Sequence, residues 1–103
     1  MLKRKREALE AAGWKVGSTQ DFLGLSDAEV TLIDVKLALA RAVKAKRLRK
    51  RMSQADVAAR VRSSQSRVAK MESGDATVSI DLLVRTLLAL GASRKELART
   101  LTG

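Results

Sequence analysis

Hydrophobic residues recur every three or four positions along most of this chain, which is the spacing of amphipathic helices. No segment alternates apolar and polar residues over the length of a half-buried strand. Because the chain has no proline, serine and glycine are the residues that mark the ends of elements. The pattern predicts an all-α protein, with five helices between Ser26 and the C-terminus.

Serine occurs at the expected start of each of these helices, and glycine follows several expected ends. A serine at the N-cap accepts a hydrogen bond from a backbone N–H of the first turn, and a glutamate three residues later completes a capping box. A glycine after the last turn ends a helix because it adopts the left-handed conformation readily. The expected N-caps are Ser26, Ser53, Ser63 or Ser64, Ser79 and Ser93, and the expected ends are near Lys50, Glu72, Gly91 and Leu101.

The long helix after Ser26 is apolar on two nearly opposite faces, so both faces need to be covered. We expect one face to pack on the later helices. The other face needs the N-terminal segment, a second copy of the chain or a foreign partner. One stripe contains Leu32, Val35, Leu39 and Val43, and the other contains Val30, Ile33, Leu37 and Ala40.

Residues 1–25 are expected to form an N-terminal arm, and residues 26–103 a helical domain. A short helix is predicted over residues 2–12, where Gly13 ends it. The only aromatic residues of the chain, Trp14 and Phe22, lie in this arm. Packing onto the long helix is the simpler interpretation, and a partner contact is the alternative because aromatic residues are enriched at interface hot spots.

The composition excludes most catalytic and metal chemistry. The chain has no His, Cys or Tyr, so Cys/His metal sites and Ser-His-Asp or Cys-His nucleophiles are excluded. We therefore expect no enzyme, no cofactor and no metal. No apolar run reaches the length of a membrane span, so we expect no membrane partner and a cytoplasmic location.

The charge is strongly positive, with 21 Lys+Arg against 11 Asp+Glu and a formal net charge of +10. Such a chain attracts polyanions such as nucleic acid or acidic proteins. A single cation is often only part of a solvated helix face, but seven of them between Arg41 and Arg51 repel one another unless an anion neutralises them. The acid-free run between Val35 and Ala55 contains Lys36, Arg41, Lys44, Lys46, Arg47, Arg49, Lys50 and Arg51.

Residues 54–72 have the spacing of a helix-turn-helix, with a tight turn at Arg62 and Ser63. The inward positions of the two short helices are apolar, and a small residue stands where the helices would cross. These positions are Val57, Ala58, Val61, Val68 and Met71.

The second of these helices begins with polar residues, as a helix that reads bases with its first turn requires. Glutamine can pair with adenine and arginine with guanine in the major groove. Gln54, at the start of the preceding helix, is placed to hold a phosphate. The predicted DNA-contacting residues are Gln54, Ser63, Ser64, Gln65, Ser66, Arg67 and Lys70.

Residues 35 to 101 resemble the lambda-repressor-like superfamily, also called the Cro/cI or XRE family. The resemblance is carried by residues 53–58 (SQADVA), by residues 64–74 (SQSRVAKMESG) and by the apolar helix that ends at Leu90 and Gly91. It implies a five-helix lambda-repressor-like helix-turn-helix domain that binds double-stranded DNA and is preceded here by a short helical arm. It also implies a nucleoid-associated protein.

The resemblance also implies roles for individual residues. Gln54 would clamp a phosphate, whereas Ser64 and Arg67 would contact phosphates or bases. The expected base contacts are Gln65, Ser66 and Lys70. An internal ion pair would join Arg47 to Glu72 and make both structural. One residue departs from the family pattern, because Arg62 occupies the turn position that usually carries glycine, where a positive φ costs about 1 kcal/mol.

The whole-chain arrangement is similar to that of HigA-type antitoxins. This likeness implies a homodimer that represses its own operator and neutralises a RelE-fold toxin, a ribosome-dependent mRNA-cleaving enzyme. Two alternatives stay open. One is a stand-alone XRE-type repressor. The other is a bridging or RNA-binding interaction protein that uses the same domain.

Overall fold

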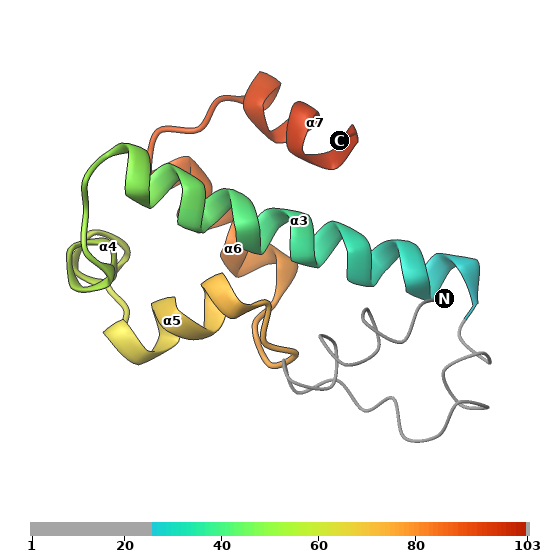
Figure 1. The fold of residues 1–103 in the computed structure, drawn as a ribbon, viewed down its shortest axis with the longest axis horizontal. Helices are drawn as coiled ribbons and strands as arrows, with labels where there is room; N and C mark the ends of the chain where they lie inside the picture. Colours follow the sequence, from blue (N-terminus) through green and yellow to red (C-terminus); the bar gives the residue numbers. More distant parts are fainter. Residues whose placement is uncertain (1–25, 103) are drawn as a thin grey trace.

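The computed structural model describes residues 26–102 of the chain. Over these residues it contains five helices and no strand, which confirms the all-α prediction (Figure 1). The predicted helix over residues 2–12, Trp14 and Phe22 lie outside the described residues. The helices are α3 (Asp27–Arg49), α4 (Gln54–Val61), α5 (Gln65–Ser73), α6 (Ile80–Ala89) and α7 (Arg94–Thr102).

The predicted serines start these helices. At four helices the serine Oγ accepts a hydrogen bond from the backbone N–H three residues later, and Ser93 does the same for Glu96. Of the two serines left open for α5, the structure uses Ser64. The confirmed N-caps of α3 to α6 are Ser26, Ser53, Ser64 and Ser79.

The long helix α3 forms the axis of the fold, with α5 on one side and α7 on the other (Figure 1). The core lies between the C-terminal half of α3 and helices α4, α5 and α6. Burial of a Val, Leu or Met side chain contributes about 1.5–3 kcal/mol each, which makes this core the main stabilising element. Its completely buried members are Leu39, Val43, Val57, Val68, Met71, Leu83 and Leu90.

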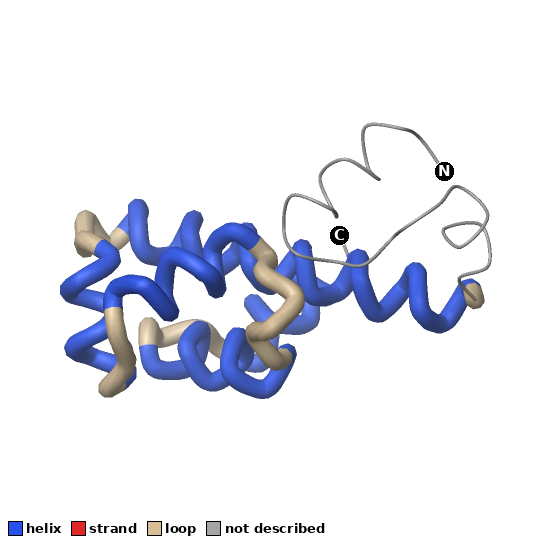
Figure 2. Tube along the Cα trace, turned by 90° about the horizontal axis from the view of Figure 1, so that it is seen from below, coloured by secondary structure: helices blue, strands red, loops and turns tan. Residues whose placement is uncertain are grey.

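The two apolar stripes of α3 are buried over only part of the helix. Leu39 and Val43 are fully buried, and Ile33 is buried on the other stripe. Leu32, in contrast, is 53% exposed, so the first stripe is not buried along its whole length. The N-terminal part of α3 projects past the other helices (Figure 2). That the arm or a second copy covers this part of α3 stays a prediction.

No helix among the described residues has the length and apolar character that crossing a bilayer requires.

Candidate nucleic-acid interface

Helices α4 and α5 pack as the predicted pair. Val57 and Ala58 of α4 and Val68 and Met71 of α5 are buried in the same cluster. Val61 is partly buried against that cluster. The inward face predicted for the helix-turn-helix is therefore present.

The turn between the two helices keeps a left-handed residue even though that residue is an arginine. Arg62 has φ 56° and ψ 50°. Its N–H donates to the carbonyl of Ala59 at 3.4 Å, and the N–H of Ser63 donates to the carbonyl of Ala58 at 2.8 Å. These bonds close the end of α4 and compensate for the strain of a side chain at positive φ. The departure from the family pattern changes the residue but not the shape of the turn.

The outward face of α5 carries polar side chains that are not hydrogen-bonded to any residue in the described part of the chain. Gln65, Ser66, Arg67 and Lys70 are all exposed. Their side chains form no hydrogen bond or ion pair with any other described residue, whereas the Ser64 hydroxyl caps the helix by accepting from the Arg67 N–H at 3.1 Å. Four free donor or acceptor groups on one short helix form a surface that can read base edges.

A small polar notch lies between the start of α5 and the connection from α5 to α6. It is lined by two hydroxyls and two cations of α5 and closed by the connection at Thr77 and Val78. The Thr77 hydroxyl donates to Asp75 Oδ1 at 2.6 Å, and the Thr77 N–H donates to the same oxygen at 2.8 Å. These two hydrogen bonds lower the pKa of Asp75. Cations and hydroxyls of this kind suit a phosphate group. These lining residues are Ser64, the N-cap of α5, and Ser66, Arg67 and Lys70 of the helix itself.

Thr77 was not among the residues predicted from the sequence. Asp75 accepts a hydrogen bond from the backbone N–H of Thr77, two residues later in the chain. An aspartate at this spacing indicates a turn. Nothing local indicates that this turn returns to the first turn of α5. Its position depends on the packing of α6 against α3.

The expected ion pair between Arg47 and Glu72 is present and joins α3 to α5. The guanidinium donates to both carboxylate oxygens, from Nε at 2.6 Å and from Nη2 at 3.0 Å. The side chains are 13% and 5% exposed. Hydrogen bonding to Glu72 raises the pKa of Arg47, although burial opposes the shift. Gln54 Nε2 donates to Glu72 Oε1 at 3.2 Å, so the same carboxylate fixes the side chain at the start of α4.

Ser63 differs from the other candidate residues. Its Oγ is buried and has no hydrogen-bond partner in the described structure. The hydroxyl is therefore not exposed beside the polar side chains of α5, and the DNA contact of Ser63 stays a prediction.

The basic run between Arg41 and Arg51 is partly neutralised within the fold. Lys46 forms an ion pair with Glu96 at 2.7 Å, and Arg47 pairs with Glu72. Lys36 is buried, where its Nζ donates to the carbonyl of Ala76 at 3.0 Å and burial lowers its pKa. The carboxylates come from residues far along the chain, so the sequence run alone did not reveal the neutralisation. The exposed remainder is Arg41, Lys44, Arg49, Lys50 and Arg51.

The packed pair of short helices, its closed turn and the free polar face of α5 define a helix-turn-helix protein. A family model described as Helix-turn-helix matches residues 43–97, which is more than half of the chain. The chain belongs to this family, of the Cro/cI-like or XRE type, and is a DNA-binding transcription regulator. Comparisons with curated proteins and with solved structures gave no match.

Proposed function

We propose that this protein is a sequence-specific repressor of transcription that binds double-stranded DNA as a homodimer. The observation that carries the proposal is the outward face of α5, where Gln65, Ser66, Arg67 and Lys70 are exposed and have no hydrogen-bond partner among the described residues. Polar groups that are buried in a fold normally have hydrogen-bond partners within it. Exposed polar side chains without such partners, held on a rigid helix, are available to bind a ligand.

In this proposal α5 lies in the major groove. Gln65 and Arg67 pair with base edges, because their side chains can form bidentate contacts with adenine and guanine. Ser66 and Lys70 add contacts to bases or phosphates. Ser64 contributes a hydroxyl beside the DNA backbone. Gln54 holds a phosphate through its backbone N–H at the start of α4, while Glu72 fixes its side chain.

A homodimer places two copies of α5 on two half-sites. In dimeric helix-turn-helix proteins the half-sites lie about one helical turn apart, so the operator mirrors the symmetry of the protein. Bound at the promoter of its own operon, such a dimer excludes the polymerase and represses transcription. The surface of α3 that projects past the other helices, together with residues 1–25, is the proposed region of dimer and partner contact.

We further propose that the protein is the antitoxin of a type II toxin–antitoxin pair that neutralises a RelE-like toxin. The likeness of the whole-chain arrangement to HigA-type antitoxins supports this role. Trp14 and Phe22 are the proposed toxin contacts, because aromatic side chains bury large areas at interfaces.

The DNA-binding proposal is tested by a mobility-shift titration at physiological salt. The probe is DNA from immediately upstream of the protein's own gene, and a scrambled duplex of equal length is the competitor. Gln65→Ala and Arg67→Ala should each cost about 1–3 kcal/mol and relax the sequence preference. Arg85→Ala is the matched control, because Arg85 lies on α6 and pairs with Asp81.

Two outcomes would contradict the proposal. If scrambled DNA displaces the probe as well as the specific duplex does, sequence-specific repression is wrong and the bridging or RNA-binding alternative is favoured. If Gln65→Ala and Arg67→Ala leave the discrimination between duplexes intact, α5 does not read the operator in this register.

The antitoxin role needs a separate test. The reading frame beside the gene is expressed alone and together with this protein, and growth and co-purification are measured. Growth arrest that this protein relieves supports the role, and loss of relief in a Trp14→Ala, Phe22→Ala variant supports the proposed contacts. A neighbouring product that is harmless and does not bind leaves a stand-alone repressor.

A further inference from the structure

Two arginines of the described structure adopt the left-handed backbone conformation. Among residues 26–102, Arg51 with φ 54° and Arg62 with φ 56° are the non-glycine residues at positive φ. Each stands two residues before an N-cap, Arg51 before Ser53 of α4 and Arg62 before Ser64 of α5. The two arginines therefore hold equivalent positions relative to the two helices of the helix-turn-helix.

Both side chains are exposed cations that the fold does not neutralise. Neither Arg51 nor Arg62 forms an ion pair or a side-chain hydrogen bond with another described residue. Lys46 and Arg47, which are close in sequence to Arg51, have carboxylate partners. The uncompensated charges thus lie beside the two chain segments that begin with Gln54 and Gln65.

We propose that Arg51 and Arg62 contact DNA phosphates on either side of the surface that α5 presents. The inference deepens the proposed function, since it requires that the helix-turn-helix binds duplex DNA. A guanidinium binds a phosphate through two parallel hydrogen bonds, which suits this task better than a single point charge.

The backbone position supports the proposal. Each arginine lies between the last turn of one helix and the cap of the next, so its Cα is fixed by hydrogen bonds on both sides. The N–H of Arg51 donates to the carbonyl of Leu48 at 3.0 Å, and the N–H of Met52 donates to the carbonyl of Arg47 at 3.1 Å. A side chain that starts from a fixed backbone loses less entropy on binding than one on a mobile loop.

Phosphate contacts have a distinct signature. They add affinity for any duplex and do not change the choice between sequences. Each neutralised phosphate also contributes about 0.9 to the slope of log affinity against log salt. The two arginines together should therefore account for a slope of about 1.8.

The experiment compares wild type with Arg51→Gly, Arg62→Gly and the double variant. Glycine adopts positive φ without strain, so the melting temperature should be equal to that of wild type or higher. Binding to the upstream duplex and to a scrambled duplex should weaken by the same factor, and the salt slope of the double variant should be less steep by about 1.8. Arg62→Asn is a second variant, because asparagine also tolerates this conformation.

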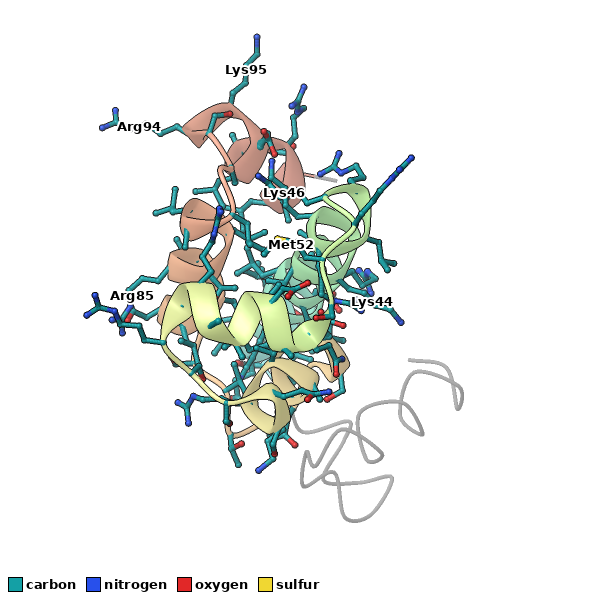
Figure 3. The ribbon with its side chains drawn as sticks, turned by 90° about the vertical axis from the view of Figure 1, so that its left-hand side faces the viewer. Lys44, Lys46, Met52, Arg85, Arg94 and Lys95 are labelled. Atoms are coloured by element: carbon teal, nitrogen blue, oxygen red, sulfur yellow. The ribbon has the colours of Figure 1, made fainter. Side chains whose placement is uncertain are left out.

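Arg94→Ala is the control for a change in net charge. Arg94 projects from α7 at the end of the molecule away from α4 and α5 (Figure 3), so its loss should leave the slope unchanged. The inference is wrong if the folded double variant keeps the wild-type slope, or if it loses discrimination between the duplexes rather than overall affinity. If the double variant keeps the wild-type slope while Gln65→Ala still relaxes the sequence preference, the inference fails and the proposed function stands. It fails together with the proposed function if wild type binds neither duplex.

Discussion

Glu72 is the residue whose replacement tests most directly how the helix-turn-helix is held together. Its carboxylate accepts hydrogen bonds from Arg47 Nε, Arg47 Nη2 and Gln54 Nε2, at 2.6, 3.0 and 3.2 Å. The substitution Glu72→Gln preserves the size of the side chain but removes its charge. One carboxylate oxygen becomes an amide NH2 group. That group is a hydrogen-bond donor and faces an N–H donor of Arg47 or Gln54, where an acceptor is needed.

The expected loss follows from burial. The side chains of Glu72 and Arg47 are 5% and 13% exposed, so most of the pair is removed from solvent. Removal of one partner of a buried pair costs about 3–5 kcal/mol, because the other charge stays buried without compensation. Arg47 keeps its bond to the carbonyl of Met52 at 3.1 Å, so we expect the lower end, about 3 kcal/mol. Domains of this size are stabilised by about 5–10 kcal/mol in total, so the variant should still fold.

The assay is urea unfolding followed by circular dichroism, with a double-mutant cycle. Glu72→Gln and Arg47→Met should each lower the free energy of unfolding by about 3 kcal/mol, which moves the midpoint by roughly 2 M urea. The variant that carries both substitutions should lie within about 1 kcal/mol of one single variant, since no charge is then left unpaired. Single losses below about 1 kcal/mol, or losses that simply add, would refute a coupled buried pair.

Three further changes test other parts of the fold. Gly74→Ala should cost about 1–2 kcal/mol in urea unfolding, because Gly74 has φ +70° and an alanine is strained there. A Cβ at Gly74 would also lie 2.6 Å from Leu37 Cδ2, so the end of the Leu37 side chain has to move. An unchanged free energy of unfolding would contradict the left-handed conformation of Gly74. Ser53→Ala removes a complete capping box and should lower the free energy of unfolding by about 1 kcal/mol, with an unchanged value arguing against the cap. A hydrogen bond from Lys46 lowers the pKa of Glu96, so the stabilisation by this pair is present at neutral pH and is lost as the pH falls through the lowered pKa of the folded state. Thermal melts of Glu96→Gln should accordingly show a weaker dependence on acid pH than those of wild type, and parallel curves would refute the pair.

The starts of the helices could be predicted from the sequence because each depends on residues that are close along the chain. A serine hydroxyl bonds a backbone N–H only three residues away, so Ser26, Ser53 and Ser79 act as caps whatever packs around them. The choice between Ser63 and Ser64 could not be made in this way. It depends on how Arg62 closes α4, which determines where α5 can begin.

The polar face of α5 was predicted for a similar reason, since Val68 and Met71 fix which side of a short helix is buried. The residues that surround this face were not. Glu72 reaches Gln54 from 18 positions away, and Lys36 reaches the carbonyl of Ala76 from 40 positions away. Contacts between distant segments depend on the packing of whole helices, and a residue pattern does not contain that information.

The match to the helix-turn-helix family begins at Val43, but the physical domain begins earlier on α3. Leu39 is completely buried and Ala40 is 2% exposed, so a core without them would contain a cavity. One turn further back, Leu37 packs on Gly74 and Lys36 bonds the carbonyl of Ala76. Both contacts fix the connection between α5 and α6, which closes the notch beside Arg67 and Lys70. The polar surface of α5 thus depends on a segment of α3 that contributes no residue to it. The shared pattern marks where family members agree in sequence, whereas the folded unit extends to wherever the core and the connection need support.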